Sequence, residues 1–243
     1  MPGALFIGTS GWSYDEWKER FYAGVRRADW LGHYAAYFDA VEVNATFYHT
    51  LKPATLKNWR KHTPARFRFA IKASRYLTHI QRLDVSARSL NLLRRQAELL
   101  GPKLAVVLWQ LPKGLARDER LLERFARRLD RWATVRHAIE FRHGSWFDDG
   151  ITSCLAEHRI AAVQSHAADW SMWDAVTTDL VYLRLHGGVR TYASAYAPAT
   201  LRRWSDRVRK WRKQGRSVHV YFDNTGDGHA VRNALTLARL CKA

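Results

Sequence analysis

The sequence predicts an α/β protein, a single (β/α)8 barrel of the TIM type that takes up residues 1–243 as one domain. Two observations lead to this prediction. The chain has 243 residues, close to the roughly 250 residues of a typical barrel of this kind. Short apolar segments alternate along it with longer amphipathic segments, and strands that alternate with helices form a parallel sheet. Eight candidate strands favour a closed barrel over an open sheet.

The strand candidates are short apolar runs. In chain order they are Leu5–Ser10, Ala40–Thr46, Phe67–Ala73, Leu104–Leu111, His137–Arg142, Ala161–His166, Leu180–His186 and Ser217–Asn224. Between them, apolar residues recur at helical spacing. The predicted helices are Asp29–Phe38, Ala54–Lys61, Ser86–Leu100, Asp118–Arg131, Asp149–Glu157, Ala199–Gln214 and His229–Leu240. Asp118 is the predicted N-cap of its helix.

Strand side chains alternate between two faces, so the residue pattern assigns each one a direction. In the second strand Val41 and Val43 share one face, while Glu42 and Asn44 share the other. The outer face of a barrel strand packs on helices and must be apolar, so the polar set is predicted to point to the barrel axis. The same parity directs these residues inward: Lys72, Glu140, Arg142, Tyr182, Arg184, His186, His219, Tyr221 and Asp223.

Charged members of this inward set lie near the carboxyl ends of the strands, where characterised barrel enzymes have their active sites. The predicted catalytic residues are Glu42, Lys72, Glu140, His186 and Asp223. Residues predicted to bind substrate are Trp12, Asn44, Tyr48, Gln110, Arg142, Arg184, Tyr192 and Asn224. The alternative is a structural polar network, in which a pair such as Glu140 and Arg184 serves only to satisfy buried charges.

Each residue type suggests a role. Arg142 and Arg184 would hold a phosphate or carboxylate, because a guanidinium matches both in bidentate geometry. Glu42 or Glu140 would be a general base. Lys72 would stabilise negative charge, or form a Schiff base if it is desolvated. Indoles beside turns and strand ends are further candidates for lining a pocket; these are Trp12, Trp109, Trp146 and Trp170.

The formal net charge of the chain is +18, which suggests a nucleic-acid partner as a second hypothesis. Much of the excess lies in predicted helices, for example between Arg207 and Lys213, where it is equally typical of solvated faces. Clustered arginines on the pocket face would favour nucleic acid. A third hypothesis is a barrel that binds a ligand without transforming it.

No metal and no cofactor are predicted. The two cysteines, Cys154 and Cys241, lack metal-type spacing and fit a reducing compartment. Glu42, Glu140, His166, His186 and Asp223 are of types that ligate divalent metals, but the inward cations oppose one there. Gly-rich phosphate-binding, zinc-protease and nucleophile-elbow motifs are not found. Without a signal-like start or a long apolar run, a cytoplasmic protein with no membrane partner is expected.

Ordered motifs along nearly the whole chain resemble the DUF72 family, also called YecE-like proteins. They begin with Ile7–Tyr14 and continue with Val41–Tyr48, Thr63–Pro64, Gln110–Pro112, Ala138–Arg142, Tyr182–Gly187 and Tyr221–Asn224. The resemblance implies a TIM-type barrel and no established reaction. Residues His166–Asp174 match none of these motifs. The resemblance and the strand pattern together predict an anion-binding enzyme of unknown reaction and leave the oligomeric state open.

Overall fold

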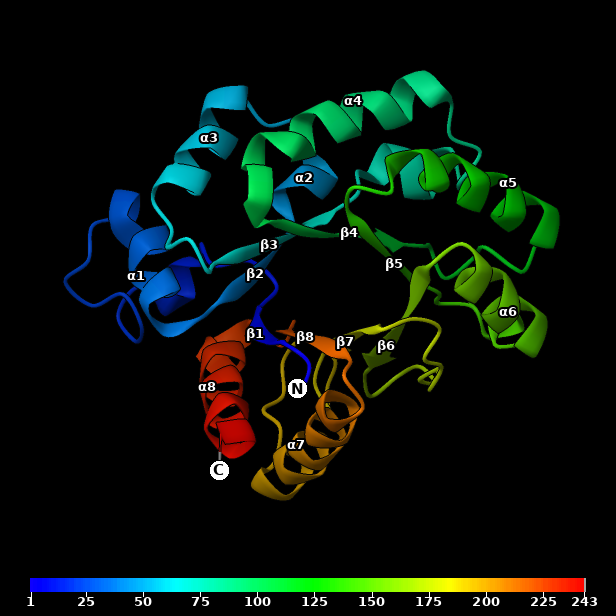
Figure 1. Ribbon diagram of the computed structural model, residues 1–243. Coiled ribbons are helices and arrows are strands. Elements are labelled where there is room, and N and C mark those ends of the chain that lie inside the picture. Colours follow the sequence, from blue (N-terminus) through cyan, green and yellow to red (C-terminus); the bar gives the residue numbers. More distant parts are fainter. Residues whose placement is uncertain (243) are drawn as a thin grey trace.

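The computed structural model describes residues 1–242 and confirms the barrel (Figure 1). Eight parallel strands follow the order β1-β8-β7-β6-β5-β4-β3-β2, and the helices surround them. The strands are β1 (Leu5–Thr9), β2 (Ala40–Val43), β3 (Arg68–Lys72), β4 (Leu104–Gln110), β5 (Arg136–Glu140), β6 (Ile160–His166), β7 (Leu180–Leu185) and β8 (Ser217–Phe222).

The helices match the seven predicted ones and add one short helix. They are α1 (Trp30–Tyr37), α2 (Ala45–Tyr48), α3 (Pro53–Lys61), α4 (Ala87–Ala97), α5 (Glu119–Leu129), α6 (Asp149–Glu157), α7 (Pro198–Lys213) and α8 (His229–Lys242). Asp118 caps α5 as predicted, since its Oδ1 accepts a hydrogen bond from the Leu121 amide at 2.9 Å.

Several strands end one or two residues before their predicted ends, and β2 ends three residues before. The segment Ala40–Thr46 leaves the sheet after Val43 and turns into α2. Asn44 has helical backbone angles, and the Thr46 hydroxyl donates to the carbonyl oxygens of Val43, at 3.1 Å, and Lys72, at 2.8 Å. These side-chain bonds compete with strand pairing and bend the chain over the end of β3.

The barrel closes between β1 and β2 through few contacts. Ser10 and Glu42 form an isolated parallel bridge, and the Gly11 amide donates to the Glu42 carbonyl oxygen at 2.7 Å. The connection from β6 to β7 differs from the others, because the fully described residues 167–179 contain no helix. Trp170 of that segment lies against Arg142 and His186, at the site described below.

The predicted alternation of strand side chains is confirmed. The outer core, between strands and helices, takes the aliphatic residues of each strand, such as Val41, Leu183 and Val220. A second, smaller core fills the inside of the barrel and includes Ala138 and Tyr182. Polar residues therefore point to the axis above this inner layer, at the carboxyl ends of the strands.

Among residues 1–242, no helix is long and apolar enough to cross a membrane.

Candidate functional site

Arg184 on β7 is the centre of a charged cluster inside the barrel. Its side chain is 1% exposed. Nε and Nη2 donate to the two oxygens of Glu42, at 2.9 and 2.7 Å. Nη1 donates to Glu140 at 2.8 Å, and Nη2 also donates to Asp223 at 2.9 Å. Together with a 3.3 Å contact from Nη1 to His186 Nε2, these bonds use all the N–H groups of a guanidinium.

Glu42 is fully buried and accepts more hydrogen bonds than Arg184 supplies. The Ser10 hydroxyl donates to one carboxylate oxygen at 2.5 Å, and the Tyr182 hydroxyl donates to the other at 2.7 Å. Asn44 in turn donates to the Ser10 hydroxyl at 2.7 Å. A carboxylate held by this many donors is fixed in place, which suits a positioning role.

Glu140 connects Arg184 to the opening of the barrel. It accepts from the Ser165 hydroxyl at 2.9 Å and pairs with Nε of Arg142. Burial raises the pKa of Glu140, but Arg142 and Arg184 outweigh it and hold the pKa well below its usual range. The Arg142 guanidinium lies 3.8 Å from the centre of the Trp170 ring, and its pairing through Nε leaves the terminal nitrogens for other partners.

Asp223 and His186 form the third side of the cluster. His186 Nδ1 lies 3.0 Å from an Asp223 oxygen, in a direction that does not meet hydrogen-bond geometry. Burial and then the charge of Arg184 lower the pKa of His186, so the imidazole is neutral at pH 7. The Asp223 side chain is 15% exposed, which makes it the carboxylate of the cluster that solvent reaches.

Lys72 differs from the other cations of the cluster. None of the described residues forms an ion pair or hydrogen bond with its half-buried amine, which lies 4.2 Å from the centre of the Phe47 ring. Burial, followed by the charge of Arg184, lowers the pKa of Lys72 to about 8. A lysine in such surroundings is partly neutral near pH 7, and the neutral amine is the nucleophilic form.

A cleft of about 770 Å³ adjoins the cluster on the side of β1 and β2. Trp12, Asn44 and Tyr48, three of the residues predicted to bind substrate, line it. The buried Asn44 Oδ1 is without a hydrogen-bond partner among the described residues. Because buried acceptors are normally satisfied, this oxygen is a candidate contact for a ligand donor.

The other predicted residues take different places. Tyr192 is 48% exposed and its ring lies 5.4 Å from His186, at the rim. Gln110 is half-buried at the end of β4, and its amide donates to the adjacent Leu111 carbonyl at 3.4 Å. Asn224 is buried behind the site and donates to Asn233 Oδ1, at 3.0 Å, and to the Ser194 carbonyl, at 2.9 Å. Its contacts link β8 to the loop that carries Tyr192.

Several residues of the cluster were absent from the predicted site. Ser10, Tyr182 and Ser165 all donate to its carboxylates. Strand parity had already directed Tyr182 inward. Ser10 ends a predicted strand, which was a usable signal. Trp170 was named only as an indole that could line a pocket, and its ring lies against Arg142. Two other tryptophans considered as pocket residues, Trp109 and Trp146, are fully buried core residues.

Comparison with known proteins gives the family. The model of DUF72, described as a protein family of unknown function, matches residues 6–243. The UPF0759 protein YunF of Bacillus subtilis is 24% identical, over 97% of this chain and 94% of its own length.

Two crystal structures of DUF72 family proteins have the same fold. The one from Thermotoga maritima has a TM-score of 0.88 at 25% identity, covering 99% of this chain and all of that one. The other, from Enterococcus faecalis, has a TM-score of 0.85 at 19% identity, covering 98% of this chain and 96% of that one. With a family match over almost its whole length, the chain belongs to the DUF72 family, a family of unknown function.

Proposed function

We propose that the cluster at the carboxyl ends of the strands is an active site, and that Lys72 is its reactive amine. The observation that carries this proposal is an unpaired, half-buried lysine with a pKa of about 8 beside a network of three carboxylates. A purely structural network would pair its cations, because an unpaired buried charge costs several kcal/mol, on the order of 3 or more. The unpaired amine of Lys72 is an exception to this rule, which makes Lys72 a candidate functional residue.

The chemistry that fits this amine is attack on a carbonyl group. Neutral Lys72 would add to the carbonyl carbon, and loss of water would give an imine, which is the Schiff-base alternative for this residue. Asp223, which solvent reaches, and the buried His186 beside it contribute proton-accepting groups. The substrate class is therefore a small aldehyde or ketone.

Arg142 would bind an anionic group of the substrate. Arg184, which was expected to share this task, spends its N–H groups on Glu42, Glu140 and Asp223. Arg142 uses Nε for Glu140, and its guanidinium lies over the Trp170 ring. Its terminal nitrogens suit the bidentate recognition of a phosphate or carboxylate. General acid/base chemistry on an anionic substrate then involves Arg142 as anchor and Lys72 as reactant.

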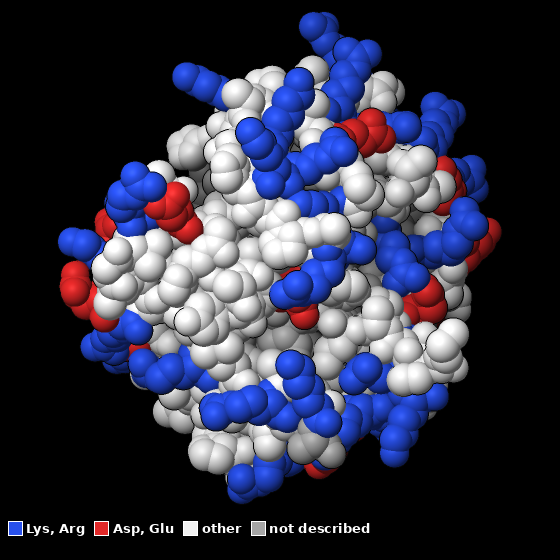
Figure 2. Space-filling view, turned by 60° about the vertical axis from the view of Figure 1, so that its left-hand side comes forward, with Lys and Arg blue, Asp and Glu red and all other residues white. Residues whose placement is uncertain are grey.

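The distribution of charge supports a small ligand over a nucleic acid. On the face seen in Figure 2, Lys and Arg side chains are scattered around a broad uncharged area and do not form one continuous patch. Many of the surface arginines pair with acidic neighbours, as Arg94 does with Glu98 and Arg127 with Glu123. Such pairs weaken the attraction for a phosphate backbone.

Reduction of the imine tests the proposal directly. The protein is incubated at pH 7.5 with dihydroxyacetone phosphate or pyruvate in the presence of sodium cyanoborohydride, and modified lysines are located by peptide mass spectrometry. We expect Lys72 to be labelled at least tenfold faster than exposed lysines, because a larger fraction of its amine is neutral. Arg142→Gln should reduce this labelling by weakening the hold on the anionic group.

The matched control is Lys57, an exposed lysine on α3. Labelling of Lys72 should disappear in Lys72→Arg and persist in Lys57→Arg. Equal labelling of Lys57 and Lys72 in the folded protein, with every probe, would contradict the role proposed for Lys72.

A further inference from the structure

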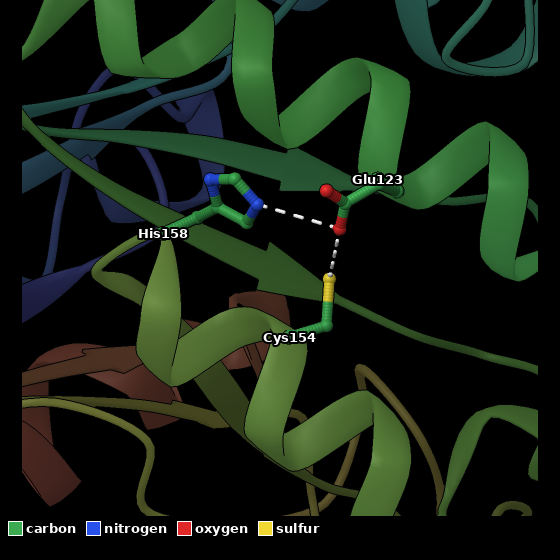
Figure 3. Close-up of side chains that lie close together, drawn as sticks. All are labelled: Glu123, Cys154 and His158. Atoms are coloured by element: carbon green, nitrogen blue, oxygen red, sulfur yellow. Dashed lines mark hydrogen bonds and ion pairs between the residues drawn. The ribbon is translucent and has the colours of Figure 1, made fainter.

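A second cluster of chemically reactive side chains lies outside the barrel, between α5 and α6 (Figure 3). Glu123 on α5 faces Cys154 and His158, which are four residues apart at the end of α6. One ligand atom from each residue lies within 4.8 Å of the others. The Arg184 cluster lies at the carboxyl ends of the strands, whereas His158 lies two residues before the start of β6. The two clusters are therefore at opposite ends of the barrel.

The two distances from Glu123 to the other members of this cluster match those between neighbouring ligands of a tetrahedral metal. Glu123 Oε2 is 3.4 Å from Cys154 Sγ and 3.4 Å from His158 Nε2. Zinc bonds of about 2.0–2.3 Å at tetrahedral angles put neighbouring ligand atoms about 3.3–3.6 Å apart. Thiolate, imidazole and carboxylate are also the three ligand types that zinc accepts in proteins.

The environment of His158 supplies independent support. Its side chain is 8% exposed, and Nδ1 lies 2.8 Å from Asp130 Oδ2. A proton on Nδ1 serves that hydrogen bond and leaves the lone pair of Nε2 directed at Glu123. Nε2 is buried and has no hydrogen-bond partner among residues 1–242. Two electron-pair donors, Nε2 and Oε2, then face each other unless a cation or a proton lies between them.

Glu123 and Asp130 are arranged as in known zinc sites. Arg127 Nε donates to Glu123 Oε1 at 2.8 Å, which fixes the carboxylate and leaves Oε2 for the cluster. Asp130 orients the imidazole through Nδ1, the usual position of an outer carboxylate behind a metal-bound histidine. Arg127 and Asp130 thus hold two of the three candidate ligands in position. Such support is expected at a metal site and is not expected where side chains are close only by chance.

We propose that Glu123, Cys154 and His158 bind a divalent zinc-type ion that joins α5 to α6, with water as the fourth ligand. On binding, a bond forms between the metal and Cys154 Sγ, and the thiol proton passes to solvent. In the metal-free cluster, burial and the hydrogen bond to Glu123 raise the pKa of this thiol to about 12. The ion replaces that proton and pairs the facing atoms of His158 and Glu123.

Cobalt titration of the full-length protein, stripped of metal with a chelator, tests the site. We expect one Co²⁺ to produce a thiolate-to-cobalt charge-transfer band that Zn²⁺ then removes. The chain has two cysteines, so the band identifies its ligand. It should be lost in Cys154→Ser and kept in Cys241→Ser, since Cys241 is buried against Ser205 elsewhere. Asp130→Asn should weaken the affinity about 10- to 100-fold.

Thermal unfolding gives a second readout. Zn²⁺ should raise the melting temperature of the wild-type protein by several degrees, since an ion that binds only the folded state stabilises it, and should leave that of Cys154→Ser unchanged. A wild-type titration without a charge-transfer band, or a band that survives in Cys154→Ser, would overturn the proposal. Neither outcome affects Lys72, because imine trapping is measured at the opposite end of the barrel.

Discussion

Replacing Arg184 by Met is expected to destabilise the protein by about 3–5 kcal/mol at pH 7, because removal of one partner leaves buried charges uncompensated. Glu42 and Glu140 are fully buried and would lose their shared cation. Asp223, 15% exposed, would lose it in part. Chemical denaturation of wild type and variant at one pH gives the difference in the free energy of unfolding.

The pH dependence separates this explanation from simple loss of packing. In the wild type, the pKa of Glu140 and that of Asp223 lie below their usual ranges, so both carboxylates add stability that is lost as the pH falls through their folded values. Without Arg184, these pKa values should rise, because fewer cations then oppose the effect of burial. The difference in stability between wild type and variant should therefore narrow from pH 7 to pH 4.5.

Arg184→Lys is the matched control, because it keeps the charge but cannot donate to two carboxylates in the same geometry. Its loss should be smaller than that of Arg184→Met. If Arg184→Met costs less than about 1 kcal/mol, or if its cost does not change with pH, the network does not depend on the guanidinium.

Replacing Lys72 by Met is expected to have opposite effects on activity and stability. The fast imine labelling at position 72 should disappear, and turnover of the substrate, once identified, should fall by at least about 10³-fold. Stability at pH 7 should rise by about 2 kcal/mol, since Met removes the cost of a half-buried ammonium. Gain in stability with loss of activity is typical of a residue retained for function.

The sign of the pH effect follows from the lowered pKa of Lys72. The folded protein releases the proton near pH 8, whereas an unfolded chain holds it to about pH 10.4. Between these values the unfolded state binds more protons, so wild-type stability rises with pH relative to the variant. The advantage of Lys72→Met should thus decrease from pH 8 to pH 10. A constant or increasing advantage over this range would contradict a lowered pKa.

The fold could be predicted because the residue pattern within each strand identifies that strand without information about the others. Alternation in segments such as Val181–His186 assigned outer and inner faces, and the aliphatic and polar residues occupy those faces in the structure. The end of β2 was missed, because the bond from Thr46 to the Lys72 carbonyl oxygen depends on the neighbouring strand. Local patterns contain no information about such contacts.

The site was harder to predict than the fold. The alternation of strand side chains directed Arg142 and Arg184 inward. It could not show which of them binds substrate, because that depends on which carboxylates each guanidinium contacts. Trp170 lies in the helix-free segment between β6 and β7, whose sequence has no periodic pattern. Its contact with Arg142 could therefore not be predicted. Cys154 gave no metal signal because its neighbour Glu123 is 31 residues away and meets it through helix packing.

The titration of Lys72 tests the central claim most directly. Reductive methylation with ¹³C-formaldehyde gives each lysine an NMR signal, and Lys72→Arg identifies that of Lys72. The proposed active site predicts a pKa of about 8 for this amine, with the exposed Lys57 as an internal reference. A Lys72 signal that titrates near the ordinary value of about 10.4 would contradict the account, because the amine would then be a solvated surface group without special reactivity.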